Sequence, residues 1–311
     1  MPAIYLKAPI THEERSALEQ EFPNYFLLTS CETLAQWDEV EIVYGSLLSE
    51  EEFKQAHHLC WIHCTSSDTD GICMESILTR GNILISLSKG QNVPQMAEYA
   101  LGAILAFAKQ FFKIAQDPKP FFQLSEKENL WTLQDKILLQ FGLGDVGTAL
   151  VRLARNCGMK CWGVRRQRSF HPFCQKNFSF QHTHSLLPAA DVCVITLSTR
   201  GRNDIVFKKA EFELMKSGSI LIGIGAGDSI DIKDLEDIAQ TGKFRGILLD
   251  LPQQNLPASS SSLWKTPSVI LTPSLAHYPE SPEHLAFQLF RKNLRLFIAG
   301  KFREMKNLIF S

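Results

Sequence analysis

The sequence lacks any marked excess of charge. Its 32 Lys and Arg residues are balanced by 33 Asp and Glu residues, for a formal net charge of -1. A nearly neutral chain has no strong electrostatic attraction to nucleic acid or to an anionic membrane surface. We therefore expect no nucleic-acid partner and no membrane partner.

The sequence also lacks an apolar run long enough to cross a bilayer. The most apolar helix-like stretch, ALGAILAFA at 100–108, is closed by Glu98 and Lys109, and a spanning helix needs about 20 residues. The first residues, MPAIYLKAPITHEER, turn polar almost at once and do not show the basic-then-apolar order of a secretory signal. These features predict a cytoplasmic protein.

Cysteine pairs with metal-binding spacing are absent as well. None of the eight cysteines forms a CxxC pair, and several lie inside apolar runs such as DVCVITL at 191–197. Buried free thiols in a reducing cytoplasm are favoured over disulfides or a zinc site. Histidines at metal-ligand spacing are not found either, so we expect no metal site.

What the sequence does contain is a regular alternation of strands and helices. KILLQF at 136–141 is a continuous apolar run, which is typical of a strand covered on both faces. Helix-like segments separate it from five further strand-like runs, at 159–164, 191–197, 219–224, 245–251 and 268–273. This order predicts βαβ units, a parallel sheet and an α/β fold. At 311 residues, the chain is long enough for two domains.

The N-terminal third alternates in the same way, with strands expected at 3–9, 40–46, 59–66 and 82–88 and helices at 11–22 and 50–56. From Val93 to about Ala115 the pattern becomes helical and is apolar nearly all round, which predicts a buried helix connecting two domains. The polar stretch 116–135, with two prolines, is predicted to be a loop.

A glycine-rich turn follows the strand at 136–141. Gly142, Gly144 and Gly147 have the GxGxxG spacing, with Leu143, Asp145 and Val146 between them. Placed between a buried strand and a helix, this spacing is typical of a dinucleotide site, where backbone N–H groups at the helix start receive a pyrophosphate. The alternative is a strand-to-helix turn without a ligand.

The end of the next strand predicts which dinucleotide is bound. An acidic residue that binds the ribose of NAD is expected about 20 residues after the glycines, yet CWGVRRQR at 161–168 has none. It offers Arg165, Arg166 and Arg168 instead, and guanidinium groups bind a 2′-phosphate well. We predict NADP in preference to NAD. An exposed basic loop without a ligand is the alternative.

Taken together, these stretches resemble the D-isomer-specific 2-hydroxyacid dehydrogenases, and the glyoxylate and hydroxypyruvate reductase type among them. The similar stretches are LCWIHCTSSDTDGI, VPQMAEYALGAILA, GLGDVG, ELMKSGSILIGIGAGDSIDIKDL, GILLDLPQQNLP and SVILTPSLAH. The resemblance implies two Rossmann-like domains with parallel sheets, the larger a doubly wound dinucleotide-binding domain. It places the substrate domain at 1–98 plus 285–311 and the cofactor domain at 99–284, and it implies a homodimer.

The resemblance also implies three catalytic positions, and the sequence departs from the family at each. Ala226 stands where an arginine clamps the substrate carboxylate, and Asn255 where a glutamate orients a histidine. Ser274 stands where that histidine exchanges a proton. A nicotinamide-dependent reaction on a 2-oxo or 2-hydroxy acid would lack its usual side chains here.

Other site residues are implied in the same way. Leu197, Gly225 and Asp250 would contact the cofactor, although Asp250 could equally be a strand-end carboxylate that accepts loop N–H groups. The substrate loop would be Ser66, Ser67, Asp68 and Thr69. Asp68 replaces a glycine of the family there, and its charge would repel an acid substrate.

Three interpretations remain open from the sequence. The first is a protein that binds NADP(H) and is inactive or strongly altered in its chemistry. The second is an active NADP-dependent reductase of a 2-oxoacid or another small carbonyl compound, with a relocated acid/base such as His277, three residues past Ser274. The third is a structural dimer without a ligand.

Overall fold

The computed structural model of the 311-residue chain describes residues 1–45, 48–66, 77, 79–117, 119, 129–167, 169–197, 207–278 and 281–310. The chain forms two compact units. We call Met1–Asn92 with Glu280–Ser311 the terminal unit and Val93–Pro279 the central unit. The boundaries expected from the sequence, 98/99 and 284/285, lie within helices, whereas the compact units keep helices α5 (Val93–Ala108) and α12 (Pro282–Ile298) whole.

The terminal unit is a six-stranded sheet in the order β13-β5-β4-β3-β1-β2. Its neighbouring strands are parallel except for the antiparallel pair β13 and β5. The strands are β1 (Ala3–Leu6), β2 (Phe26–Leu28), β3 (Val40–Tyr44), β4 (Trp61–Cys64), β5 (Leu84–Leu87) and β13 (Leu308–Phe310).

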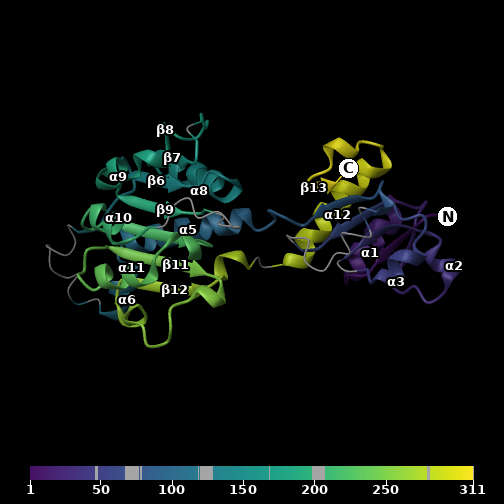
Figure 1. Ribbon diagram of the computed structural model, residues 1–311, viewed down its shortest axis with the longest axis horizontal. Coiled ribbons are helices and arrows are strands. Elements are labelled where there is room, and N and C mark those ends of the chain that lie inside the picture. Colours follow the sequence, from purple (N-terminus) through teal and green to yellow (C-terminus); the bar gives the residue numbers. More distant parts are fainter. Residues whose placement is uncertain are drawn as a thin grey trace. The chain divides into compact units, whose positions relative to one another are not determined.

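Helices cover both faces of this sheet (Figure 1). Helix α1 (His12–Glu21) and α12 contribute apolar side chains to the core on one face, and α2 (Leu34–Trp37) and α3 (Glu50–Gln55) do so on the other. Helices α1 and α3 each begin with a capping box, in which Thr11 pairs with Glu14 and Ser49 with Glu52. These caps satisfy backbone N–H groups that the helices leave open, and they set where each helix begins.

His63 is a core residue of the terminal unit, as its position on an apolar strand predicts. Its side chain is fully buried, with Nδ1 2.7 Å from Ser86 Oγ and Nε2 3.1 Å from Ser88 Oγ. The rings of Trp61 and Phe290 lie against it. Burial lowers the pKa of His63 to about 3, so the imidazole stays neutral in the folded protein.

The central unit is a seven-stranded, entirely parallel sheet in the order β12-β11-β10-β9-β6-β7-β8 (Figure 1). The strands are β6 (Ile137–Phe141), β7 (Lys160–Arg165), β8 (Lys176–Ser179), β9 (Val192–Ile195), β10 (Ile220–Ile224), β11 (Gly246–Leu251) and β12 (Val269–Pro273). The strand order reverses between β6 and β9. Ligands of doubly wound sheets bind beside such a point, at the carboxyl ends of the strands.

Helices also cover both faces of the central sheet. Helices α5 and α8 (Asp145–Asn156) pack against one face, and α10 (Lys209–Leu214) and α11 (Ile232–Ala239) pack against the other. A short helix, α9 (Thr183–Leu186), lies beside α10. This arrangement confirms the predicted α/β class with two Rossmann-like sheets.

The structure corrects the long helix predicted from Val93 to about Ala115. Helix α5 ends at Ala108, and α6 (Phe111–Gln116) begins after Gln110, which has a left-handed backbone with φ 53°. Left-handed geometry interrupts a right-handed helix. The apolar pattern runs on through this break, so the periodicity did not reveal it.

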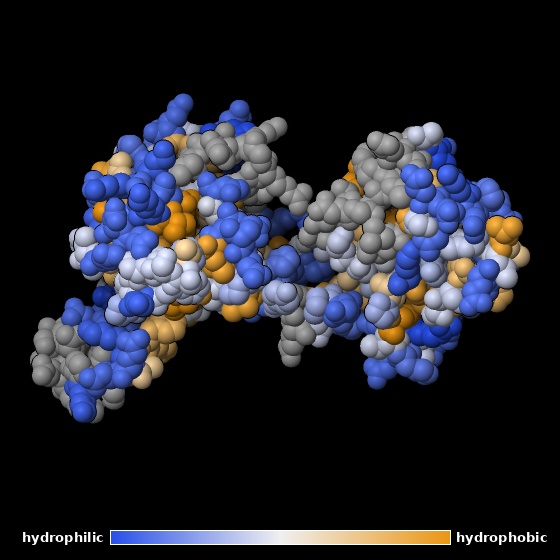
Figure 2. All heavy atoms as spheres, turned by 60° about the horizontal axis from the view of Figure 1, so that its bottom comes forward, coloured by the Kyte–Doolittle hydropathy of each residue, from blue (hydrophilic) through white to orange (hydrophobic). Residues whose placement is uncertain are grey.

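Outside the cores, hydrophobic residues form small, separate groups among hydrophilic ones on the faces that Figure 2 presents. No helix in the described part of the chain is long and apolar enough to span a membrane. The seven cysteines within that part are free thiols. No group of three or more His, Cys, Asp or Glu side chains among the described residues could hold a metal ion.

Candidate cofactor-binding site

The glycine-rich loop begins at Gly142, directly after strand β6. Gly142 has φ 89°, and a Cβ there would lie 2.8 Å from the carbonyl oxygen of Thr196. Both facts require glycine. The Gly142 carbonyl accepts hydrogen bonds from Gln140 Nε2 at 3.0 Å and from Thr196 Oγ1 at 3.2 Å. Gln140 and Thr196 therefore fix the base of the loop, although no sequence motif singled them out.

Gly147 and Gly144 have different roles in the loop. A Cβ on Gly147 would lie 2.0 Å from the Gly142 carbonyl oxygen, so glycine lets helix α8 pack onto the loop. A Cβ on Gly144 would meet no described atom within 4 Å. No described side chain caps helix α8, which begins at Asp145. The helix start thus offers open backbone N–H groups and space for a phosphate, which fits a pyrophosphate.

The residues between the glycines divide into packing and exposed positions. Leu143 is buried, and its Cδ1 would lie 2.4 Å from a Cβ on Gly163 of strand β7. Val146 is half-buried and Asp145 is exposed in the first turn of α8. The Asp145 charge stabilises the helix dipole, but it opposes a pyrophosphate bound at the same helix end.

Arg165, at the end of β7, is bound to the glycine loop. Its Nη2 donates to the Leu143 carbonyl at 3.0 Å, and its Nη1 donates to Ser169 Oγ at 2.9 Å. The adjacent Arg166 is exposed, while Arg168 lies outside the described residues. The structure therefore brings Arg165 directly against the loop.

A buried histidine, His171, contacts the helix that follows the glycine loop. His171 Nε2 lies 3.1 Å from Thr148 Oγ1, in the first turns of α8. Burial lowers the pKa of His171, and the nearby Arg165 charge lowers it further. A neutral imidazole here adds no second positive charge that could draw an anion away from Arg165.

Strands β10 and β11 end in loops that bring two of the replaced catalytic positions together. Ala226 is fully buried in the core. At the next residue, a Cβ on Gly227 would lie 2.8 Å from Asn255 Cγ. Asn255 Nδ2 donates to Asp228 Oδ1 at 3.4 Å. The arrangement therefore keeps the two loops adjacent, but neither position carries a charged side chain.

Asp250, near the end of β11, is buried and fully engaged. Its Oδ1 accepts from Thr272 Oγ1 at 2.5 Å and from the Leu275 backbone N–H at 2.7 Å, and its Oδ2 accepts from the Ala276 N–H at 3.2 Å. The backbone carbonyl of Asp250 accepts from the N–H of Gly225, which has φ 62°. Asp250 therefore makes the loop contacts of a strand-end carboxylate.

The loop that Asp250 holds carries the third replaced position. Ser274 has a left-handed backbone with φ 53°, which is uncommon for a residue other than glycine. The short 3₁₀ helix Leu275–His277 follows, and His277 is exposed. Tyr99 Oη, on α5, donates to Thr272 Oγ1 at 3.2 Å and ties this loop to α5. Tyr99 and Thr272 lie in stretches that resemble the family, but the sequence assigned neither residue a role.

The remaining predicted residues are placed as follows. Leu197 follows β9, and its Cδ2 would lie 3.3 Å from a Cβ on Gly142, so it packs beside the glycine loop. In the terminal unit, the Ser66 carbonyl accepts from the Ser88 N–H at 3.0 Å. Ser67, Asp68 and Thr69 lie outside the described residues.

Comparison with known proteins agrees with this geometry. The sequence profile of the D-isomer specific 2-hydroxyacid dehydrogenase NAD binding domain matches residues 101–276, which is more than half of the chain. A glyoxylate reductase of Pyrococcus horikoshii is 23% identical over 297 residues, covering 91% of this chain and 85% of that protein.

Solved structures share the fold over the whole length. The D-lactate dehydrogenase of Lactobacillus jensenii with NAD⁺ matches with a TM-score of 0.76 and 17% identity, covering 99% of this chain and 100% of that one. An acyclic imino acid reductase in complex with NADPH and D-Arg matches with a TM-score of 0.67 and 17% identity over the same shares. The chain belongs to the D-isomer specific 2-hydroxyacid dehydrogenase family, and its central unit is built on that family's NAD-binding domain.

Proposed function

We propose that this chain binds NADP(H) in preference to NAD(H) at the Gly142–Gly147 loop and is inactive, or strongly altered, in the 2-oxoacid chemistry of its family. The observation that carries the proposal is a contrast. The glycine loop keeps the turn, the close packing and the open helix start that a pyrophosphate needs. The catalytic positions hold Ala226, Asn255 and Ser274.

A nicotinamide dinucleotide whose pyrophosphate is bound at this loop would supply or accept a hydride through its nicotinamide ring. The other half of the reaction needs side chains that clamp a carboxylate and move a proton. The buried Ala226 methyl has no polar atom, and neither Asn255 nor Ser274 is a general acid near neutral pH. A positioned acid/base contributes roughly 10²–10⁴ in rate, and residues that act as a unit are lost together.

The preference for NADP(H) is supported by the two arginines at the end of β7 and by the lack of a carboxylate among residues 161–168. Arg165 already donates to Leu143 and Ser169, so it brings positive charge to a 2′-phosphate from a fixed position. Arg166 is exposed beside it. A bidentate guanidinium contact with a phosphate is among the stronger charge-assisted interactions.

The proposal is tested by titrating the purified chain with NADPH and, separately, with NADH. Arg165→Ala combined with Arg166→Ala should weaken NADPH binding at least about tenfold, the equivalent of one charge-assisted contact, and leave NADH binding nearly unchanged. Arg303→Ala, at an exposed arginine of the terminal unit, is the matched control. Asp145→Asn should strengthen both cofactors by removing the repulsive charge.

Equal affinity for the two cofactors in the unchanged protein would refute the NADP preference alone. Binding of neither cofactor would refute the proposed site. The two outcomes are distinguishable. Equal affinity still means that the glycine loop binds a dinucleotide, whereas binding of neither cofactor means that it does not.

Catalysis through His277 is a second candidate. Asp250 fixes the backbone at Leu275 and Ala276, so His277 extends from a held loop rather than a loose one. A small carbonyl substrate could then receive its proton from this imidazole. His277→Gln should abolish any measured carbonyl reduction, whereas Tyr278→Phe, at the exposed neighbour, should not. Turnover that survives His277→Gln would exclude this histidine as the acid.

Restoring the family residues tests whether the remaining geometry is competent. Ala226→Arg, Asn255→Glu and Ser274→His together should create glyoxylate reduction with NADPH. Histidine is among the residues that tolerate the left-handed backbone of position 274 better than most. A folded, cofactor-binding and inert triple variant would mean that Asp68, or another feature of the substrate loop, blocks an acid substrate.

We also propose that the chain forms a homodimer through the central unit. The apolar side chains of Leu101 and Leu105 on α5 remain half exposed, which suits a helix packed against a second copy. Light scattering on the purified protein would give the mass directly, and a monomer at micromolar concentration would refute the dimer.

A further inference from the structure

We propose that a cavity at the amino-terminal edge of the central sheet binds a small organic carboxylate through Arg245. The cavity measures about 290 Å³ and is lined by Phe107, Phe112, Lys113, Gln116, Arg245 and Ser268 among others. Arg245 and Ser268 directly precede strands β11 and β12. The glycine loop follows the carboxyl end of β6, so the cavity is a separate site at the opposite edge of the same parallel sheet.

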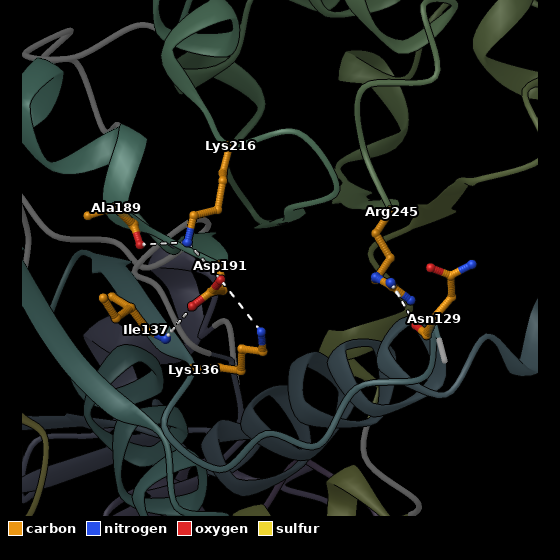
Figure 3. A network of polar contacts seen from close by, with 7 residues as sticks. All are labelled: Asn129, Lys136, Ile137, Ala189, Asp191, Lys216 and Arg245. Atoms are coloured by element: carbon orange, nitrogen blue, oxygen red, sulfur yellow. Dashed lines mark hydrogen bonds and ion pairs between the residues drawn. The ribbon is translucent and has the colours of Figure 1, made fainter. Parts of the chain in front are cut away.

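Arg245 is the unusual residue of this cavity. Its Nη2 donates to the Asn129 carbonyl at 2.8 Å (Figure 3), and its guanidinium lies 4.3 Å from the Trp131 ring centroid. Its Nε and Nη1 are buried and have no hydrogen-bond partner, and no ion pair joins it to an acid in the described part of the chain. Burial lowers the pKa of Arg245, but a guanidinium remains charged near neutral pH. The residue as a whole is half-buried, and a cation whose donor groups are withdrawn from water is costly unless an anion pairs with it.

Another charge at the same sheet edge is fully paired. Asp191 Oδ2 accepts from the Ile137 N–H at 2.9 Å, and Oδ1 lies 2.9 Å from Lys216 Nζ and 4.0 Å from Lys136 Nζ (Figure 3). Asp191 is thus committed to two lysines. Lys136 also lies over the Trp131 ring, 4.6 Å from its centroid. Among the described residues, the side chains around Arg245 and Trp131 are therefore cationic and aromatic rather than acidic.

The walls of the cavity define the ligand class. Arg245 and Lys113 provide positive charge, and Gln116 and Ser268 provide polar groups. Phe107 and Phe112, whose ring centroids are 5.3 Å apart, provide an apolar wall. A bare inorganic anion would leave these rings facing a hydrated ion. A monocarboxylate with an aromatic or apolar body matches both parts, because its charge can pair with the Arg245 guanidinium that lines the cavity while the body contacts the rings.

The test is calorimetric titration of the full chain with phenylacetate, with its neutral isostere phenylacetamide and with inorganic phosphate. Phenylacetate should bind at least about tenfold more tightly than phenylacetamide, which lacks the charge that Arg245 pairs with. It should also bind more tightly than phosphate. Saturating NADPH should leave phenylacetate binding unchanged, because the two sites lie at opposite sheet edges. This comparison needs no variant and does not depend on the proposed cofactor preference.

Variants then assign the site. Arg245→Met should weaken phenylacetate at least tenfold, and Arg245→Lys should weaken it less, because it keeps the charge but loses the planar fork. Lys243→Met is the matched control, since the Lys243 ammonium donates to the Glu213 carbonyl and does not line the cavity. Its binding should match that of the unchanged protein.

Four results would overturn the proposal. They are undetectable phenylacetate binding, equal affinity for phenylacetate and phenylacetamide, full affinity in a folded Arg245→Met protein, and competition by NADPH. If Arg245→Met instead alters the mass of the protein in solution and phenylacetate does not bind, Arg245 serves a contact between copies, and the ligand site is likewise refuted.

Discussion

Strand β11 has a charged residue at each end, the buried Asp250 and the half-buried Arg245, and the two differ in how many partners they have within the chain. Asp250, toward its carboxyl end, accepts three hydrogen bonds from Thr272 and from the backbone at Leu275 and Ala276. Arg245, before its amino end, donates one described hydrogen bond and stacks on a ring. A charge with all its partners in the chain holds a loop in place. No ion pair joins Arg245 to an acid among the described residues, which leaves its charge available to an anion from outside the chain.

The largest expected effect is the loss of NADPH affinity on substitution of Gly147, at the carboxyl-terminal edge of the central sheet. Gly147→Ala places a Cβ 2.0 Å from the Gly142 carbonyl, so the loop must shift, and NADPH affinity should fall at least about 100-fold. Gly144→Ala is the control: its Cβ meets no described atom within 4 Å, so thermal stability should hold while affinity drops. An unaffected affinity in Gly144→Ala would mean that no phosphate approaches this residue.

The next largest effect is expected on the unfolding free energy when Asp250, at the carboxyl end of β11, is replaced. Asp250→Ala leaves the Leu275 and Ala276 N–H groups and the Thr272 hydroxyl without their acceptor, so urea unfolding should show a loss of about 3 kcal/mol. Asp250→Asn, which keeps the shape and one acceptor oxygen, should lose less. Equal losses in the two variants would show that the charge itself, rather than the hydrogen-bond pattern, holds the loop.

The amino edge provides the sharpest contrast, because Asp191 and Arg245 share it (Figure 3). Asp191→Ala removes the acceptor of the Ile137 N–H and the partner of Lys216 and should cost about 2 kcal/mol of unfolding free energy. Arg245→Met should lower the unfolding free energy by less than about 1 kcal/mol, or raise it, since it removes a half-buried charge that has no acid partner among the described residues. A large loss of unfolding free energy in Arg245→Met would show that Arg245 serves to stabilise the fold.

The smallest effect concerns a buried group that stays neutral, His63. Its pKa is about 3 in the folded protein and about 6.5 in an unfolded chain. Below pH 6.5 the unfolded chain binds a proton that the folded chain does not, so stability falls as pH falls. Between pH 7.5 and 5.5 the loss should be about 1.4 kcal/mol. His63→Gln should lose that part of the pH dependence, and an unchanged slope would contradict the burial.

The parts of the fold that sequence predicts best are the buried strands. Runs such as ILLQF and GILLDL are apolar on both faces, and all six strands expected in the central sheet form. The missed strands β2, β8 and β13 have only three or four residues each, and their pairing depends on a neighbouring strand rather than on their own pattern. The break at Gln110 has no glycine or proline to announce it.

The site was predictable only where backbone geometry dictates the residue. The three glycines announce their loop because no other residue fits at Gly142 and Gly147. The sequence left Asp250 open between a cofactor contact and a strand-end carboxylate, because its donors Thr272 and Leu275 come from a segment distant in sequence. The sequence did not single out Arg245, because an arginine just before a strand is normally exposed to solvent. Its burial against Trp131 arises only from packing.

The division of the chain has a consequence for the order in which it folds during synthesis. The central unit is contiguous in sequence, whereas the terminal unit needs residues from both ends. Phe287, Phe290 and Leu294 of α12 complete one face of the sheet of the terminal unit, and they are synthesised after the whole central unit. Residues 1–92 are therefore made well before the helix that covers this face, and the face stays uncovered while the central unit is synthesised and folds. Chaperone dependence of the nascent chain should accordingly concentrate in residues 1–92.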